Sequence, residues 1–172
     1  MVSQKQIIVL GALLVTIFSI GLEPVLLNCG YAQKASFTAQ LSGNKEVPPS
    51  ISVARGWAWF NQTGNTIWYK LNVSGLDKIM GAHIHNGKIG QIGDPIVTLF
   101  HSETPTGLVN GTLIEGNLTS SDLPPVVGFV NKMERGETYV NVHTSTFPTG
   151  EIRGQIEMEN ATMMSNSTMT SK

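Results

Sequence analysis

Short runs of alternating apolar and polar residues, separated by turns rich in glycine and proline, dominate the chain between residues 35 and 157. Because successive side chains on a strand point to opposite faces, this period of two is typical of half-buried β-strands. In the segment 56–60, Trp57 and Trp59 share one face while Ala58 and Phe60 share the other. No long helical period competes in this region, so the pattern predicts an all-β domain.

The pattern predicts about eight strands, at the spacing expected of a β-sandwich or barrel. They cover residues 37–41, 56–60, 67–73, 79–85, 95–100, 107–118, 139–144 and 151–157. The stretch Gln62-Thr63-Gly64-Asn65 is a hairpin signal between the second and third strands. One short helix is expected over 123–135, because Ser121 and Asp122 are good N-cap residues and Gly136 would end it.

The first 32 residues are predicted to be a signal peptide. A polar start containing Lys5 precedes the apolar run 7–22, and Gly30-Tyr31-Ala32 offers a small-x-small cleavage site. The apolar run is shorter than the ~20 residues of a membrane span, so cleavage after Ala32 is favoured over an uncleaved anchor. We therefore expect a secreted or cell-surface protein that touches a membrane only if the anchor is kept.

The composition of the chain excludes some classes of binding partner. With 13% charged residues and a formal net charge of −1, the chain offers no basic surface for nucleic acid. The single cysteine, Cys29, lies in the signal peptide, so the mature domain has no internal disulfide and no cysteine ligand for a metal. Residues 158–172 are polar and aperiodic and are predicted to be a disordered tail. The tail contains Met158, Met163, Met164 and Met169. Their thioethers are soft ligands that would suit Cu(I), although a flexible stalk is the favoured interpretation of the tail.

Six Asn-x-Ser/Thr triplets follow the signal peptide and would be N-glycan acceptors in an exported chain. Several lie beside predicted turns, where a glycan is easily accommodated. A chain rich in Asn, Ser and Thr also forms such triplets by chance, so their use depends on the host. The acceptors are Asn61, Asn72, Asn110, Asn117, Asn160 and Asn166.

Three groups of residues together resemble the CHRD domain, a module first described in chordin and found widely in exported microbial proteins. They are 41–43 with 46–49, then 82–85 followed by a glycine-rich loop, and 139–144 followed by 150–155. The resemblance implies an extracellular β-sandwich module over residues 35–157. It implies no settled activity, so the partner would be an unknown extracellular protein, a surface or matrix component, or a metal ion.

The four histidines are the main candidates for chemistry. His83 and His85 stand two apart on a predicted strand and therefore present two imidazoles on one face, an arrangement suited to copper or zinc. His143 on the penultimate strand would add a third nitrogen, and His101 follows another strand end. Alternatively, each ring donates an N–H to a loop carbonyl, and the histidines are a folding signature without a ligand.

A second resemblance is to Cu,Zn superoxide dismutase, also a Greek-key β-sandwich. It implies copper ligands at His83, His85 and His143, with His101 at the bridging position and Arg153 at the place of an anion-guiding arginine. The other zinc-binding histidines and the disulfide cysteines of that family are missing. The fold class is thus an immunoglobulin-like or superoxide dismutase-like sandwich, and the alternative function is a copper-only dismutase.

The remaining distinctive residues are assigned structural roles. A bidentate pair between Arg153 and Glu46 would join the last strand to the first loop. Asn141 would tie the loop 148–150 to the sheet, and Glu151 belongs to the same group. The three tryptophans are expected to be core and sheet-face residues rather than a sugar platform. Because no nucleophile motif or phosphate loop is present, a binding or structural module is favoured over an enzyme, and no catalytic residue is assigned.

Overall fold

The structure is a computed structural model that describes residues 34–123 and 125–159. Its elements are β1 (Lys34–Ser42), the 3₁₀ turn η1 (Gly43–Lys45), β2 (Arg55–Thr63), β3 (Thr66–Leu76), β4 (Ile79–Asn86), β5 (Pro95–His101), β6 (Val109–Leu118), α1 (Val126–Glu134), β7 (Thr138–Thr144), β8 (Ile152–Gln155) and β9 (Glu157–Met158). The strands form one antiparallel path in the order β5-β4-β7-β8-β1-β2-β3-β6, and β9 pairs with β1. The predicted all-β class is confirmed.

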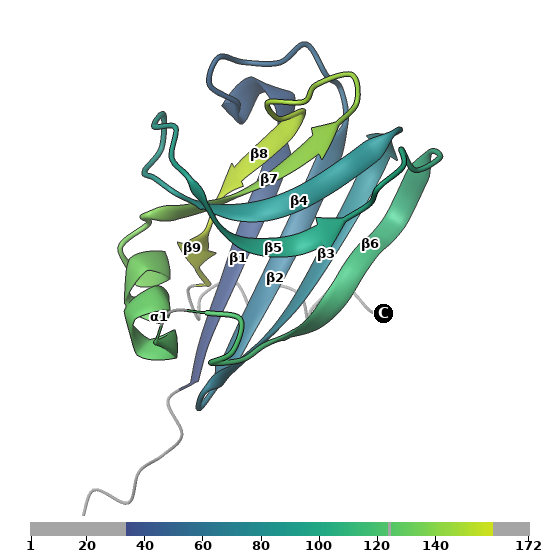
Figure 1. Cartoon of the computed structure of the whole chain (residues 1–172). Coiled ribbons are helices and arrows are strands. Elements are labelled where there is room, and N and C mark those ends of the chain that lie inside the picture. Colours follow the sequence, from purple (N-terminus) through teal and green to yellow (C-terminus); the bar gives the residue numbers. More distant parts are fainter. Residues whose placement is uncertain (1–33, 124, 160–172) are drawn as a thin grey trace, which may run out of the picture. The chain divides into compact units, whose positions relative to one another are not determined.

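The path curves into a sandwich that is nearly closed like a barrel. In Figure 1, β4, β5, β7 and β8 pass in front of β1, β2 and β3, and β6 lies at the right side of the molecule. β3 pairs with β6 and β4 pairs with β7, so the chain crosses three times between the two halves, from β3 to β4, from β5 to β6 and from β6 to β7, as in a Greek-key arrangement. The alternate residues that point inward form the core; Phe37, Phe60, Leu71, Ile84 and Val142 are each at most 1% exposed.

The predicted alternation on the second strand is confirmed. Ala58 and Phe60 are fully buried, whereas Trp57 on the opposite face is 39% exposed. The predicted hairpin follows, with Gly64 at φ 58° between β2 and β3. Glycine adopts this left-handed conformation without the clash that a Cβ would cause, so the turn signal in the sequence has a direct physical basis.

The helix begins later than predicted. It starts at Val126 rather than Leu123, and Asp122 does not cap it. The Asp122 carboxylate instead accepts bonds from the backbone N and the Oγ1 of Thr119, both at 2.8 Å, and so closes a turn of its own. The predicted end is confirmed, because Gly136 has φ 62° and its N–H donates to the carbonyl of Met133.

The domain extends slightly beyond its predicted end. Met158 pairs with Phe37 in β9, and the N–H of Glu159 donates to the carbonyl of Ser36, so these two residues belong to the sheet and not to a tail. The predicted signal peptide, Cys29 and residues 160–172 lie outside the described residues. Among the described residues, no helix is long and apolar enough to cross a membrane.

Three loops cover the outer surface of β4, β7 and β8. They connect β1 to β2, β4 to β5 and β7 to β8. The first and third are tied together, since Ser50 Oγ donates to the carbonyl of Glu151 at 2.7 Å. The second is fixed to the sheet by the N–H of Gly93, which donates to the Tyr139 hydroxyl at 3.3 Å. This covered surface holds the candidate site.

Candidate metal centre

Strand register brings three of the four histidines together. His83 and His85 lie on the outward face of β4, and His143 lies on β7 directly opposite Gly81. The ring centroids of His83 and His85 are 5.9 Å apart, those of His83 and His143 are 5.1 Å apart, and those of His85 and His143 are 5.7 Å apart. The structure therefore brings together the three histidines that were predicted to lie close to one another.

One nitrogen from each ring faces a common point. These three atoms all lie within 4.8 Å of one another. Each ring also has one buried nitrogen without a hydrogen-bond partner: Nδ1 of His83, Nε2 of His85 and Nε2 of His143. Ligand nitrogens sit about 2.0–2.1 Å from a shared zinc ion, and hence about 3–4 Å from one another. The 4.8 Å limit is wider than this spacing, so the rings would have to move closer together to share an ion.

Backbone carbonyls fix the protonation of two of the rings. Nδ1 of His85 lies 2.9 Å from the carbonyl oxygen of Gly93, and Nδ1 of His143 lies 3.1 Å from that of Pro148. Because a carbonyl only accepts, each Nδ1 carries the hydrogen and each Nε2 keeps its lone pair. Metal-binding histidines in proteins are commonly oriented by this kind of bond.

Burial keeps the three rings neutral at pH 7. It lowers the pKa of His83 to about 4, with a smaller contribution from the neighbouring His143 and His85 rings. Burial likewise lowers the pKa of His85 and of His143, partly opposed by their bonds to the carbonyls. A neutral imidazole is the form that binds a metal, so protons compete weakly for these nitrogens near neutral pH.

Two glycines make room for this arrangement. A Cβ on Gly81 would lie 3.0 Å from Cε1 of His83, so the ring occupies the space that a side chain at residue 81 would take. A Cβ on Gly93 would lie 1.7 Å from the carbonyl oxygen of Asn86. The loop between β4 and β5 can therefore close over His85 only with glycine at residue 93.

An aromatic stack borders the cluster on one side. The Tyr139 ring stacks on His85 at 5.0 Å between centroids, and the Arg153 guanidinium lies 3.4 Å from the centre of the same Tyr139 ring. Both contacts need a ring face, so Tyr139 is held between the two side chains. Arg153 also donates from Nη2 to the carbonyl of Lys88 at 3.1 Å and is only 3% exposed.

The predicted ion pair between Glu46 and Arg153 is wrong. It is absent from the salt bridges of the described residues, because the guanidinium is occupied by Tyr139 and Lys88. Glu46 instead accepts a long bond of 3.5 Å from Nδ2 of Asn141. Burial raises the pKa of Glu46 to about 7, although Arg153 and Asn141 act in the opposite direction.

Glu151 connects two of the covering loops to the sheet. Its Oε1 accepts from Ser52 Oγ and its Oε2 from Thr144 Oγ1, both at 2.7 Å. The loop from β7 to β8 also approaches Asn141 so closely that a Cβ on Gly150 would lie 2.5 Å from its Oδ1. All four residues predicted to be structural, Glu46, Asn141, Glu151 and Arg153, are buried.

His101 does not join the cluster. Its side chain is 61% exposed, and its Nε2 lies 3.1 Å from Oε1 of Glu103 on the surface. The structure therefore does not place His101 at the bridging position that the resemblance to Cu,Zn superoxide dismutase implied. Its strand pairs with β4 through a bulge, and residue 101 lies opposite Gly81 rather than opposite a histidine.

Four of the predicted glycan acceptors lie on strands, and Asn117 stands one residue before the end of its strand. Asn61 is on β2, Asn72 on β3, and Asn110 and Asn117 on β6. The Asn110 side chain is engaged, since its Oδ1 accepts from the N–H of Gly75 at 2.8 Å. Asn160 and Asn166 lie outside the described residues.

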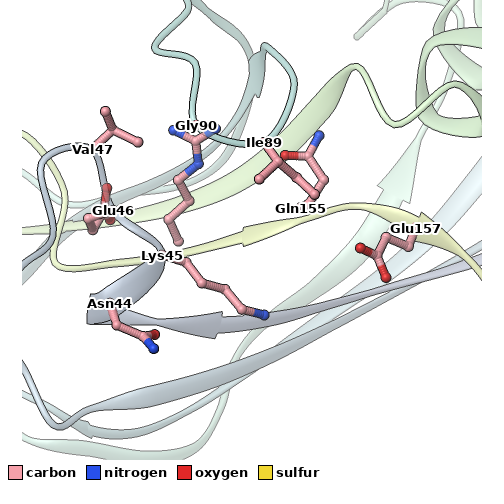
Figure 2. A pocket seen from close by; sticks show the side chains of 9 residues that line it. Asn44, Lys45, Glu46, Val47, Ile89, Gly90, Gln155 and Glu157 are labelled. Atoms are coloured by element: carbon pink, nitrogen blue, oxygen red, sulfur yellow. The ribbon is translucent and has the colours of Figure 1, made fainter.

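Two hollows open beside the histidines. One of 340 Å³ is lined by His85, Tyr139, Asn141, Arg153 and the covering loops. The next, of 320 Å³, shares Glu46, Val47 and Arg153 with the first and continues to Glu157; Figure 2 shows Lys45, Gln155 and Glu157 lining it. Of the three clustered histidines, His85 alone lines these hollows.

Sequence reasoning missed Tyr139, Gly81 and Gly93. The signal for Tyr139 was present, because it stands two and four residues before Asn141 and His143 and therefore shares their face. The roles of the two glycines depend on contacts with His83 and with the Asn86 carbonyl. Strand alternation alone does not reveal such contacts.

Comparison with known proteins places the chain in a family. The family model "CHRD domain" matches residues 37–156. Chordin from Xenopus laevis is 27% identical over 146 residues, covering 81% of this chain and 15% of chordin. Chordin from Danio rerio is 26% identical over 141 residues, covering 75% of this chain and 14% of that protein.

The chain thus spans about a seventh of the length of these curated relatives, and no solved structure matches it. The matched residues include the two phrases that supply the histidine cluster, and the chain belongs to the CHRD domain family.

Proposed function

We propose that this protein is an extracellular CHRD binding module that holds one copper ion through His83, His85 and His143. The single observation that carries the proposal is the histidine cluster itself: each ring offers a nitrogen within 4.8 Å of the other two, and each ring has a buried nitrogen without a hydrogen-bond partner. A purely structural role explains the bonds from Nδ1 of His85 and His143 to carbonyls. It gives no reason to bury three lone pairs side by side without a partner.

Copper is favoured over other metals by the chemistry of the donors. Three neutral imidazoles suit Cu and Zn, whereas Ca²⁺ and Mg²⁺ prefer oxygen ligands. Between the two remaining metals, divalent copper binds nitrogen sites more tightly than zinc. Zinc is the competing occupant, and three protein ligands would leave a position open on either ion.

The extracellular location is supported by the predicted signal peptide, residues 1–32. Membership of the CHRD family agrees with it, as does the lack of cysteine from residue 30 onward, since the fold needs no reduced thiol. Because the domain has no cysteine after residue 29, it would have to hold a copper ion without thiolates, and imidazoles suit that role.

A copper-only dismutase is a second candidate, favoured by one observation. The hollow of 340 Å³ beside His85 is bounded by the buried Arg153, which would attract a small anion toward the open position of the ion. The enzyme and the binding module share the same ligands. Turnover of superoxide by the copper-loaded protein distinguishes them.

The decisive test is metal content. Untagged full-length protein is incubated with Cu(II) or Zn(II), excess metal is removed, and bound metal is counted by mass spectrometry. We expect one equivalent of copper, with three nitrogen ligands visible by electron paramagnetic resonance. The double variant His83→Ala with His85→Ala should lose it, and His143→Ala should weaken copper binding by more than about 100-fold, the upper end of the loss seen when only a residue that orients a ligand is removed.

His101→Ala is the matched control, because this histidine lies on the same half of the sheet but outside the cluster. It should retain the full equivalent. Copper binding that survives the double variant, or that is lost equally in His101→Ala, would contradict the proposal. Variants that bind no less copper but unfold more easily would assign the histidines to folding alone.

A further inference from the structure

All three tryptophans of the chain lie on the outer face of β2 and β3, on the opposite half of the sandwich from the histidines. Trp57 is 39% exposed and Trp68 is 36% exposed, and Trp59 lies half-buried between them. The solvent side of an antiparallel sheet is normally polar. Large aromatic side chains gathered on such a face indicate a contact surface.

Strand register shows that each tryptophan has polar neighbours on both sides. Trp57 lies between Gln40 of β1 and Asn72 of β3, and Trp59 lies between Thr38 and Lys70. Trp68 lies between Asn61 of β2 and Asn117 of β6. We refer to the three tryptophans and these six partners as the tryptophan face. It alternates flat apolar rings with side chains that donate and accept hydrogen bonds.

The tryptophan face is hollowed in two places. A hollow of 310 Å³ is bounded by Trp57 and Trp59 together with Thr38, Gln40 and Glu157. A second hollow of 380 Å³ lies between Trp59 and Trp68, beside Lys70 and two asparagines. The Trp57 and Trp59 rings are stacked at 6.0 Å with 27° between their planes, so they form one continuous apolar strip between the hollows.

We propose that the tryptophan face binds a neutral polysaccharide chain. A sugar ring presents C–H groups on its faces and hydroxyls around its rim. Its faces pack on aromatic rings, whose π-systems attract the weakly positive C–H groups. Its hydroxyls both donate and accept, and the exposed amide of Gln40 matches both roles. Asn61 and Asn72 would serve mainly as N–H donors, because Oδ1 of Asn61 accepts from Ser36 Oγ and Oδ1 of Asn72 is buried. The alternation of rings and amides provides both kinds of contact at successive sugar units.

The charges on and around this face favour a neutral glycan over an acidic one. The nearby cations already have partners within the protein: Lys70 pairs with Glu115 at 3.2 Å, and Lys45 donates to the carbonyl of Gln40 at 2.8 Å. Arg55 donates to the carbonyls of Val53 and Ala54. The hollow beside Trp57 also contains the carboxylates of Glu157 and Glu159. Lys45 is the one cation that lines this hollow, so a sulfated glycan or an anionic membrane would meet two carboxylates against one ammonium group.

The test uses full-length protein made in bacterial cells without N-glycosylation, so that Asn61 and Asn72 are unmodified. Binding is measured on a panel of cellulose, chitin, xylan, β-1,3-glucan, glucomannan and starch, and by tryptophan fluorescence with soluble fragments. Because every tryptophan of the chain lies on this face, the fluorescence reports on it directly. We expect binding to at least one neutral glycan with a shift in emission.

Trp57→Ala and Trp68→Ala should each weaken that binding by about tenfold or more, as expected of tryptophans central to an interface. Ile51→Ala is the matched control, since this exposed apolar residue (92%) lies in a loop away from the tryptophan face. The double variant His83→Ala with His85→Ala should bind the glycan normally, so failure of the copper proposal is distinguishable from failure of this one.

Three results would overturn the inference. One is the absence of binding to every glycan on the panel. Another is glycan binding that Trp57→Ala and Trp68→Ala leave unchanged while both variants remain folded by circular dichroism. The third is self-association of the wild-type protein in sedimentation experiments that the same variants abolish, since the face would then join two copies of the chain.

Discussion

The outer surface of the sandwich has two halves that are built by the same strand alternation but differ in cover. On β4, β7 and β8, three loops close over the outward residues, and Asn141 and Arg153 are at most 4% exposed. On β2 and β3, the outward residues Trp57 and Trp68 are at least 36% exposed. Alternation therefore decides which residues point outward, whereas the loops decide whether an outward residue meets water.

The two halves consequently differ in which groups are left without a favourable partner. Under the loops, polar atoms are cut off from water and must find partners, yet one nitrogen of each histidine and Oε1 of Glu46 have none. On the open half, Oδ1 of Asn72 is likewise buried without a partner, but the main difference is that large apolar rings remain exposed. The first condition calls for a ligand that accepts lone pairs, and the second for one that covers aromatic faces.

The largest loss of stability should come from adding a side chain in the tight space under the loops. In Gly93→Ala the new Cβ would lie 1.7 Å from the carbonyl of Asn86, so the loop that bonds His85 must move. We expect a loss of about 3 kcal/mol in the free energy of unfolding, measured in urea. Gly107→Ala is the control, since a Cβ there meets nothing within 4 Å, and it should change the free energy by less than about 0.5 kcal/mol.

The second effect is a change in stability with pH caused by Glu46. Its pKa is raised from 4.5 to about 7 in the folded protein, so the stability it contributes is complete below pH 4.5 and is lost as the pH rises through 7. Glu46→Gln cannot ionise. Relative to the wild type it should gain about 2 kcal/mol between pH 5 and pH 8.

Urea unfolding of the metal-free proteins at the two pH values measures this gain. The lowered pKa values of the histidines act in the opposite sense, because protonation of these rings destabilises the fold as the pH falls below 6.5. That contribution is common to both proteins and cancels in the comparison. A difference between variant and wild type that does not change with pH would show that Glu46 is neutral or ionised throughout the range.

A smaller change should lower the affinity of the proposed metal site without disturbing the fold. In Gly81→Ala the Cβ would stand 3.0 Å from Cε1 of His83, so the ring must tilt by a few tenths of an ångström. We expect copper affinity to fall about tenfold, because ligand positions must be held to within about 0.5 Å. Competition with a chelator of known affinity measures it. Gly128→Ala on the exposed side of α1 should leave copper affinity unchanged, and equal affinity in both variants would argue against His83 as a ligand.

Strand alternation and turn residues were sufficient to predict every strand from β1 to β8 and to place His83, His85 and His143 on strands of one sandwich. The pairing of β4 with β7, and hence the closeness of the three rings, depends on long-range register that local patterns do not contain. The predicted ion pair failed for a related reason. Arg153 has a better partner in Tyr139, and that contact exists only after β7 and β8 are paired.

The smallest effect on folding should come from the open half. Trp57 is 39% exposed and its main aromatic contact is the stack with Trp59. Trp57→Ala should therefore reduce the free energy of unfolding by about 1 kcal/mol or less, the range of a partly exposed aromatic pair. A loss of 3 kcal/mol or more would instead make Trp57 part of the fold. If the small value is found together with weakened glycan binding, the two halves differ in kind: the covered half stabilises the domain and holds the proposed metal site, and the open half serves a ligand that folding does not require.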